Sequence, residues 1–158
     1  MEFRIMTYNI YGARLADGKK LAKSIKKYKP DFVALQEVDK NTKRSNFRDV
    51  TQDFALELGY NYYYFQKAMD FDKGEFGIAF VSKYDVKNIY VHELPSAGNE
   101  KRQVLAAQIS SKYKKHILVI NTHLDYEPTV KSTQIDDLMT VIDYFKGDMK
   151  FLCGDFNL

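Results

Sequence analysis

Apolar residues recur with the period of a helix in three stretches of the chain. The apolar positions are Leu21, Ile25 and Tyr28; Val50, Phe54, Ala55 and Leu58; and Ile135, Leu138, Met139, Ile142 and Phe145. Gly59 and Gly147 stand at the ends of the second and third stretches, where glycine commonly ends a helix. The pattern therefore predicts three helices. The lysines of the first stretch favour a solvated helix face over a nucleic-acid patch.

Eight shorter runs are rich in β-branched and aromatic residues, which predicts strands. They are Phe3–Ile10, Phe32–Val38, Tyr60–Phe65, Phe76–Ser82, Val86–Leu94, Val104–Ile109, Ile117–Thr122 and Lys150–Cys153. The predicted order is β-α-β-α-β-β-β-β-β-α-β, in which four consecutive strands lack a following helix. This order indicates an α/β protein with a mixed sheet, or with two sheets packed face to face and helices outside.

The composition is that of one soluble globular domain. The chain has 158 residues, of which 45% are hydrophobic and 28% charged, so a disordered or low-complexity chain is excluded. The longest apolar runs, such as Ile117–Ile120, are too short for a transmembrane segment. The net charge of +3 permits an anionic substrate without indicating nucleic acid.

One cysteine, Cys153, excludes an internal disulfide framework and a cysteine-rich zinc site. It lies within an apolar run, which favours a buried structural thiol. No signal peptide precedes the first strand-like run. We therefore expect a cytoplasmic protein, with a secreted protein that has lost its leader as the alternative. The sequence does not predict an oligomeric state.

Four apolar strand-like runs end in polar residues. The first ends at Asn9, and the second at Gln36 and Glu37. The other two end at residues 121–123 (Asn-Thr-His) and 154–157 (Gly-Asp-Phe-Asn). Any one of these ends could be an ordinary turn or ion pair. Because α/β sheets commonly bind ligands at the carboxyl ends of their strands, four such ends together favour a shared polar site.

The residue types at these ends limit the chemistry. The sequence contains no phosphate-binding glycine loop and no serine in a nucleophile elbow. Carboxylate oxygens, as in Glu37 and Asp155, suit Mg²⁺ or Mn²⁺ better than Zn²⁺. A nearby histidine such as His123 can act as a general acid or base, or can stabilise developing charge. The combination indicates metal-assisted hydrolysis of a phosphate ester.

These residues lie in stretches that resemble the endonuclease/exonuclease/phosphatase superfamily, which includes pancreatic-type deoxyribonucleases and neutral sphingomyelinases. The matching stretches are residues 7–10 (TYNI), 30–38 (PDFVALQEV), 76–83 (FGIAFVSK), 121–125 (NTHLD) and 154–157 (GDFN), with smaller matches at Arg44-Ser45 and around Gln134. They occur in the family's order along the whole chain. The resemblance implies a four-layer α/β/β/α sandwich of two packed mixed sheets, with the second sheet incomplete.

The resemblance also implies roles for individual residues. Glu37 would be the main metal carboxylate, with Asn9 beside it to orient the metal or the phosphate. The metal would be Mg²⁺ or Mn²⁺. Asp155 would orient or deprotonate the attacking water, Asn157 would hold a phosphate oxygen, and His123 would contact the scissile phosphate. All five residues are expected to converge at one end of the sheets.

Two further roles are implied by the resemblance alone. Glu75 would be the carboxylate partner of His123, although it could belong to an ordinary acidic loop with Asp70 and Asp72. Arg102 falls where the family often carries an arginine that neutralises the substrate. Its alternative is a surface arginine.

The sequence departs from the family pattern after residue 157. Family members continue to a later aspartate and a terminal Asp-His pair, whereas this chain ends at Leu158. We therefore expect residues 1–158 to be a single domain of this family with its C-terminal part missing, rather than a degenerate member. The expected substrate is a phosphate ester: nucleic acid, a phospholipid head group or a small phosphodiester. A non-catalytic binding or structural module with the same fold is the alternative.

Overall fold

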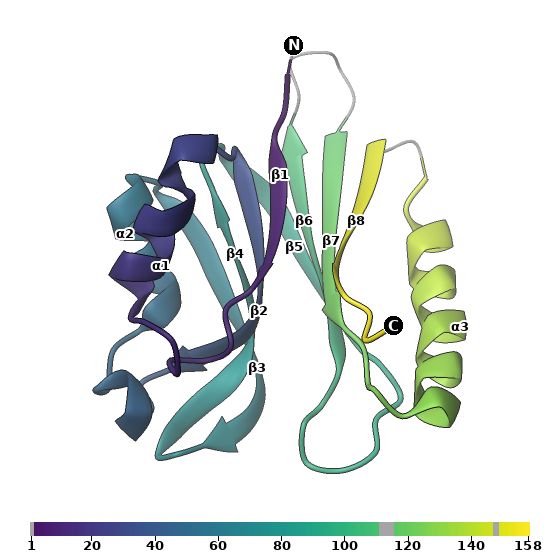
Figure 1. Ribbon diagram of the computed structural model, residues 1–158. Coiled ribbons are helices and arrows are strands. Elements are labelled where there is room, and N and C mark those ends of the chain that lie inside the picture. The colour runs from purple at the N-terminus through teal and green to yellow at the C-terminus, as the bar shows by residue number, and fades with distance from the viewer. Residues whose placement is uncertain (1, 111–115, 147–148) are drawn as a thin grey trace. The chain divides into compact units, whose positions relative to one another are not determined.

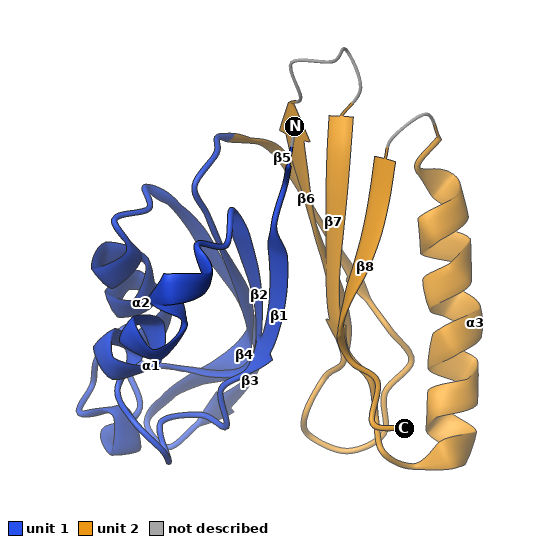
Figure 2. Cartoon of the chain, turned by 45° about the horizontal axis from the view of Figure 1, so that its top comes forward, with its two compact units in different colours: residues 1–85 blue, residues 86–158 orange. Residues whose placement is uncertain are grey.

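The strands and helices occur in the predicted order in the computed structural model, which describes residues 2–110, 116–146 and 149–158 (Figure 1). The chain divides into two units, residues 1–85 (unit 1) and residues 86–158 (unit 2), drawn in blue and orange in Figure 2. Each unit contains one four-stranded sheet of mixed direction, with two α-helices along one face in unit 1 and one in unit 2. The predicted α/β class with two mixed sheets is therefore confirmed.

The sheet of unit 1 has the strand order β1-β2-β4-β3. Its strands are β1 (Ile5–Asn9), β2 (Phe32–Lys40), β3 (Tyr62–Phe71) and β4 (Gly74–Ser82). β1 runs parallel to β2, and β4 runs antiparallel to both β2 and β3. The parallel pair brings the carboxyl ends of β1 and β2 side by side, with Asn9 opposite Gln36.

Two helices cover one face of this sheet. They are α1 (Gly18–Ile25) and α2 (Val50–Leu58), and each begins at an aspartate whose side chain accepts a backbone hydrogen bond. α2 ends at Gly59 in the left-handed conformation, as predicted. The buried apolar cluster between helices and sheet comprises Ile10, Leu21, Ala22, Ile25, Val33, Leu35, Val38, Val50, Phe54, Ala55, Ala79 and Val81.

The apolar pattern of the first predicted helix includes one residue that is neither in that helix nor buried. α1 ends at Ile25, and Tyr28 lies in a short 3₁₀-helix, η1 (Lys26–Tyr28), with 53% of its surface exposed. Lys29 follows in the left-handed conformation and ends this turn. The tighter turn moves Tyr28 away from the face that Leu21 and Ile25 bury.

The sheet of unit 2 has the order β5-β6-β7-β8. Its strands are β5 (Val86–Glu93), β6 (Gln103–Ser110), β7 (His116–His123) and β8 (Met149–Asp155). β5, β6 and β7 are antiparallel neighbours, while β7 and β8 are parallel. The parallel pair again places two strand ends together, with His123 opposite Asp155.

The helix α3 (Pro128–Tyr144) packs on one face of this sheet with a stripe that differs from the prediction. Leu138 is buried, but Ile135 and Met139 are 40% and 50% exposed. The fully buried Gln134 starts the true stripe, which continues through Leu138, Val141 and Phe145. Because the pattern was read from apolar residues alone, it left out the buried Gln134 and included the exposed Ile135 and Met139. Gly147, predicted to close the helix, lies outside the described residues.

Within the part of the chain that the structure describes, no helix is long and apolar enough to cross a membrane.

Candidate functional site

Glu37 projects from a bulge in β2. Leu35 pairs with Ala79 of β4, but the next pair joins Val38 to Gly77, so β2 carries one extra residue. Val33 and Leu35 face the apolar cluster, and strict alternation would place the Glu37 carboxylate there too. The bulge gives that core position to Val38 instead, and Glu37 adopts a left-handed φ of 54°. Such a conformation costs about 1–3 kcal/mol and is concentrated at functional sites.

Asn9 holds the Glu37 side chain from the neighbouring strand. Its amide nitrogen donates a hydrogen bond to Glu37 Oε2. Its amide oxygen accepts one from the backbone nitrogen of Tyr11, 3.0 Å away, which fixes the orientation of the amide. The backbone nitrogen of Gly12 donates to the Glu37 carbonyl at 2.7 Å. We call Asn9 and Glu37 the unit-1 half-site.

A buried ion pair supports this half-site. Asp39, which is fully buried, accepts two hydrogen bonds from the Arg44 guanidinium, at 2.6 and 2.8 Å. The pKa of Arg44 is raised, first by the hydrogen bond to Asp39 and in smaller part by the charges of Asp39, Asp72 and Glu37. The Glu37 carboxylate therefore lies within electrostatic reach of a fixed cation. The sequence did not predict that Asp39 pairs with Arg44, because an aspartate near the end of a strand has no pattern that indicates a buried ion pair.

The two strand ends of unit 2 place His123 beside Asp155. His123 Nε2 lies 3.8 Å from Asp155 Oδ2, and His123 is 8% exposed. Gly154 makes this close pairing possible. A Cβ at position 154 would lie 2.1 Å from the carbonyl oxygen of Thr122, and the residue has a φ of +144°. The glycine of the GDFN stretch is therefore required by the approach of β8 to β7.

Asn157 folds back over these two residues. Its side-chain nitrogen donates to the Leu124 carbonyl at 2.6 Å and lies 3.4 Å from His123 Nε2. Its backbone nitrogen donates to Asp155 Oδ1 at 3.0 Å. The structure thus brings His123, Asp155 and Asn157 together, and we call them the unit-2 half-site.

Gln134 fixes the loop that follows His123. Its side-chain oxygen accepts a hydrogen bond from the Asp125 backbone at 2.8 Å, and its nitrogen donates to the Pro95 carbonyl at 2.8 Å. The residue is fully buried; its contact with Asp125 is buried as well, and its contact with Pro95 is partly buried. The small sequence match around Gln134 corresponds to this positioning contact.

Glu75 and Arg102 have different surroundings. Glu75, on β4, lies 3.9 Å from the Lys67 ammonium with its side chain 34% exposed. Arg102 is 8% exposed, which excludes the surface-arginine alternative, and its Nη1 lies 2.5 Å from Glu100 Oε2. This contact is an ion pair, and within the described residues Arg102 Nε and Nη1 make no hydrogen bond. The roles assigned to Glu75 and Arg102 stay predictions.

Cys153 is the buried, structural thiol that its apolar surroundings predicted. It is 9% exposed on β8, and burial raises the pKa of its thiol to about 11. A thiol with so high a pKa is protonated at neutral pH and is a poor nucleophile.

The two half-sites offer different donors. Glu37, taken out of the apolar core and oriented by Asn9, presents carboxylate oxygens of the kind that Mg²⁺ and Mn²⁺ prefer. His123, Asp155 and Asn157 present an imidazole, a carboxylate with 32% of its surface exposed, and an amide. These groups can move a proton and hydrogen-bond to an anion. The convergence of the two half-sites on one substrate stays a prediction.

Comparison with known proteins gives one family. The family model described as "Endonuclease/Exonuclease/phosphatase family" matches residues 6–158. No curated protein matches the chain.

Several solved structures share the fold. An endonuclease/exonuclease/phosphatase from Beutenbergia cavernae has a TM-score of 0.78 at 23% identity, with 99% of this chain and 47% of that one covered. The human Nocturnin catalytic domain has a TM-score of 0.74 at 22% identity, covering 99% and 65%. A mannosyl-6-phosphatase from Bacteroides thetaiotaomicron has a TM-score of 0.71 at 18% identity, covering 99% and 66%. The chain thus spans about half to two thirds of the length of these proteins.

Proposed function

Since the chain belongs to the endonuclease/exonuclease/phosphatase family, we propose that it hydrolyses phosphate esters with the help of a divalent metal ion. The family match over residues 6–158 is the observation that carries the proposal. Members of this family are hydrolases of phosphate esters and are generally metal-dependent. The preferred ester is a phosphodiester, and nucleic acid, a phospholipid head group and a small diester are the candidate substrates.

The unit-1 half-site would hold the metal. Glu37 supplies the carboxylate, and the hydrogen bond from Asn9 keeps that carboxylate in place. Mg²⁺ commonly takes only one or two protein carboxylates and completes its shell with water and phosphate oxygens. When bound, such an ion neutralises charge on the phosphate oxygens. The nearby Arg44–Asp39 pair keeps the strand end rigid, so that the carboxylate does not reorganise during the reaction.

The unit-2 half-site would act on the attacking water and on the phosphate. Asp155 can accept a proton from the water, and His123 can donate a hydrogen bond to a phosphate oxygen. Asn157 orients both through its contacts with Asp155 and His123. Arg102, which is predicted to neutralise the substrate, already forms an ion pair with Glu100, so it would have to share its guanidinium between Glu100 and the phosphate.

A binding measurement tests the metal assignment without depending on turnover. Glu37→Gln keeps the size of the side chain but removes its charge, and we expect at least about tenfold weaker Mn²⁺ binding in calorimetric titration. Glu57→Gln removes the same charge from helix α2 and should leave the affinity unchanged. Equal binding by wild type and Glu37→Gln would remove Glu37 from the metal site.

Turnover tests whether both half-sites serve one reaction. The substrates are bis(p-nitrophenyl) phosphate, plasmid DNA, abasic DNA and sphingomyelin, each with Mg²⁺, with Mn²⁺ and with EDTA. Glu37→Gln and Asp155→Asn should each lower metal-dependent turnover by about 10²-fold or more. If they act as a unit, the double variant should be hardly worse than either single variant. Losses that multiply would mean that the two residues act independently.

A non-catalytic module with this fold is the second candidate. It predicts a folded chain that neither binds Mn²⁺ through Glu37 nor turns over any ester. Metal binding through Glu37 would argue against it even where turnover is slow.

A further inference from the structure

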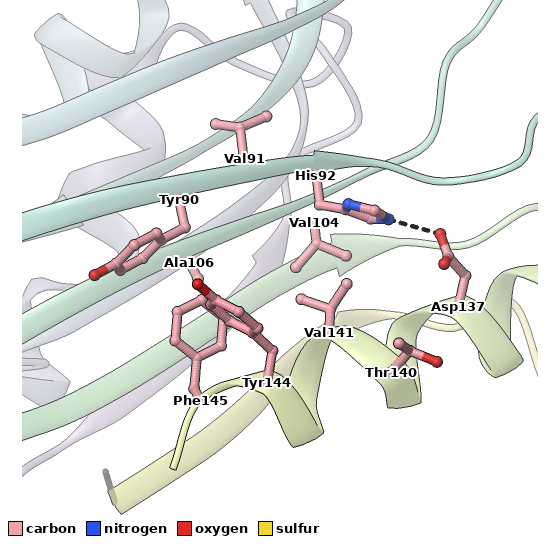
Figure 3. A pocket seen from close by; sticks show the side chains of 10 residues that line it. All are labelled: Tyr90, Val91, His92, Val104, Ala106, Asp137, Thr140, Val141, Tyr144 and Phe145. Carbon is pink, nitrogen blue, oxygen red and sulfur yellow. Dashed lines mark hydrogen bonds and ion pairs between the residues drawn. The ribbon is translucent and has the colours of Figure 1, made fainter. Parts of the chain in front are cut away.

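A cavity of about 320 Å³ lies between strand β5 and helix α3 within unit 2 (Figure 3). Its lining includes the side chains of Val104 and Ala106 from β6 and Val141 from α3. A cavity of this size matches the lower end of the range for small-molecule sites, about 300–1,000 Å³, and such sites are mostly apolar.

Three aromatic rings form one end of the cavity. The ring centroids of Tyr90 and Phe145 lie 4.7 Å apart with an interplanar angle of 63°. Those of Tyr144 and Phe145 lie 5.2 Å apart with an interplanar angle of 88°. Tyr144 is 77% exposed and contributes little to the core. The faces of aromatic rings attract cations, and apolar groups pack against them.

The other end is polar and acidic. His92 Nε2 and Asp137 Oδ2 are joined at 2.7 Å across the cavity, from β5 to α3, as the dashed line in Figure 3 marks. Together with Thr140 these two residues also line a second, more open hollow that continues past Glu93 and Asp136. The two hollows therefore adjoin at these three residues, and we call them together the groove, with an aromatic end and a carboxylate end.

The charge of the carboxylate end is only partly balanced. His92 faces Asp137, and the Lys101 ammonium lies 3.5 Å from Glu93, between two well-exposed side chains. Asp136 adds a further exposed carboxylate. The groove therefore favours a positively charged group beside an apolar one.

This groove is separate from the unit-2 half-site. Tyr90, His92, Val104 and Ala106 pair across β5 and β6 and share the sheet face that α3 covers. Val104 pairs with Thr122, and successive side chains of a strand alternate between faces, so His123 belongs to the opposite face. A ligand in the groove would therefore not compete directly for His123 or Asp155.

We propose that this groove is a second binding site, for a small organic cation with an apolar body and a primary ammonium group. The apolar body would lie against Tyr90, Tyr144 and Phe145. The ammonium group would lie near the Asp137 and Asp136 carboxylates. The proposal is independent of the phosphate-ester chemistry.

Three probes of matched size and different charge test the proposal. They are 2-phenylethylammonium, neutral 2-phenylethanol and the anion 3-phenylpropionate, each titrated at pH 7 and followed by calorimetry and by amide chemical shifts. We expect the ammonium to bind at least about tenfold more tightly than the carboxylate. Equal affinity for the two ions, or no binding of the ammonium, would overturn the proposal.

Variants locate the binding. Asp137→Asn should weaken ammonium binding about tenfold, whereas Asp143→Asn, which removes the same charge from an exposed position of the same helix, should not. Because Asp137→Asn also alters the contact with His92, Thr140→Arg gives a second measurement. Thr140 is exposed, so the variant should fold, and its bulk and charge should abolish binding. Thermal melts establish that each variant is folded, and unchanged binding by Thr140→Arg would place the ligand elsewhere.

Discussion

The two units place their polar strand ends by opposite means. In unit 1, β2 departs from regular pairing, and the extra residue of its bulge takes Glu37 out of the apolar core. In unit 2, β7 and β8 keep their register to the last pair, and a glycine lets the strands approach closely enough to set His123 beside Asp155. One half-site therefore depends on local backbone strain and a supporting ion pair, and the other on close strand packing. The two should respond to different mutations.

The largest effect is expected where close packing is broken. Gly154→Ala would place a Cβ 2.1 Å from the Thr122 carbonyl oxygen, and because the contact is with backbone, β7 and β8 would have to shift apart where His123 pairs with Asp155. We expect a loss of more than about 4 kcal/mol in the free energy of unfolding, or failure of unit 2 to fold. Urea unfolding followed by circular dichroism measures it.

Gly98→Ala is the matched control for this prediction. Gly98 also has a positive φ, +85°, but a Cβ there would meet nothing within 4 Å. Its substitution should cost only the conformational strain, about 1 kcal/mol. If both variants lost the same stability, the close approach of β7 and β8 would not be the reason for Gly154.

The next effect concerns the ion pair of unit 1. Arg44→Met would leave the fully buried Asp39 carboxylate without its guanidinium, which typically costs about 3–5 kcal/mol. Denaturant titration at pH 7 measures the loss. Replacing both partners, as Asp39→Leu with Arg44→Met, should recover part of the stability, because no buried charge is then left unpaired. A single variant as stable as wild type would show that the pair does not support β2.

A buried amide gives the corresponding test in unit 2. Gln134→Leu keeps a similar volume but leaves the Asp125 amide and the Pro95 carbonyl without their partner. The expected loss is about 1–3 kcal/mol in the free energy of unfolding. The exposed Gln52 of helix α2 provides the control, since Gln52→Leu should change stability by less than about 0.5 kcal/mol. Equal losses in the two variants would contradict a special role for Gln134.

The sequence predicted the order of elements well because helical and strand periods depend on local spacing. Asn9, Glu37, His123, Asp155 and Asn157 were predicted as site residues because each lies at the end of an apolar run or just after it. Within each unit the structure brings them into contact, and their predicted roles in one site stay predictions.

Features that depend on pairing between distant segments could not be predicted. The bulge at Glu37 is set by the partner strand β4, and simple alternation from Val33 and Leu35 would have directed its carboxylate into the core. The α3 stripe was misplaced for a similar reason: Gln134 is buried because distant backbone groups satisfy its amide. The contact of His92 with Asp137 joins residues 45 positions apart, so no local sequence pattern predicts it.

The smallest expected effect is a pH dependence at Cys153, on the closely packed strand β8. Burial raises its thiol pKa from 9.0 to about 11, so the folded state keeps the thiol proton over a range in which the unfolded chain releases it. The unfolded state then binds fewer protons than the folded state, and the stability from this group falls as the pH rises above 9. At pH 10 the loss amounts to about 1 kcal/mol. Because lysines and tyrosines titrate in the same range, the measurement is the difference between wild type and Cys153→Ala in unfolding free energy at pH 8 and pH 10.

The folded thiol should also react with 5,5′-dithiobis(2-nitrobenzoate) far more slowly at pH 8 than the thiol in guanidinium chloride. Equal reaction rates in the two states would mean that β8 opens readily, and close packing could not then be what places Asp155 beside His123.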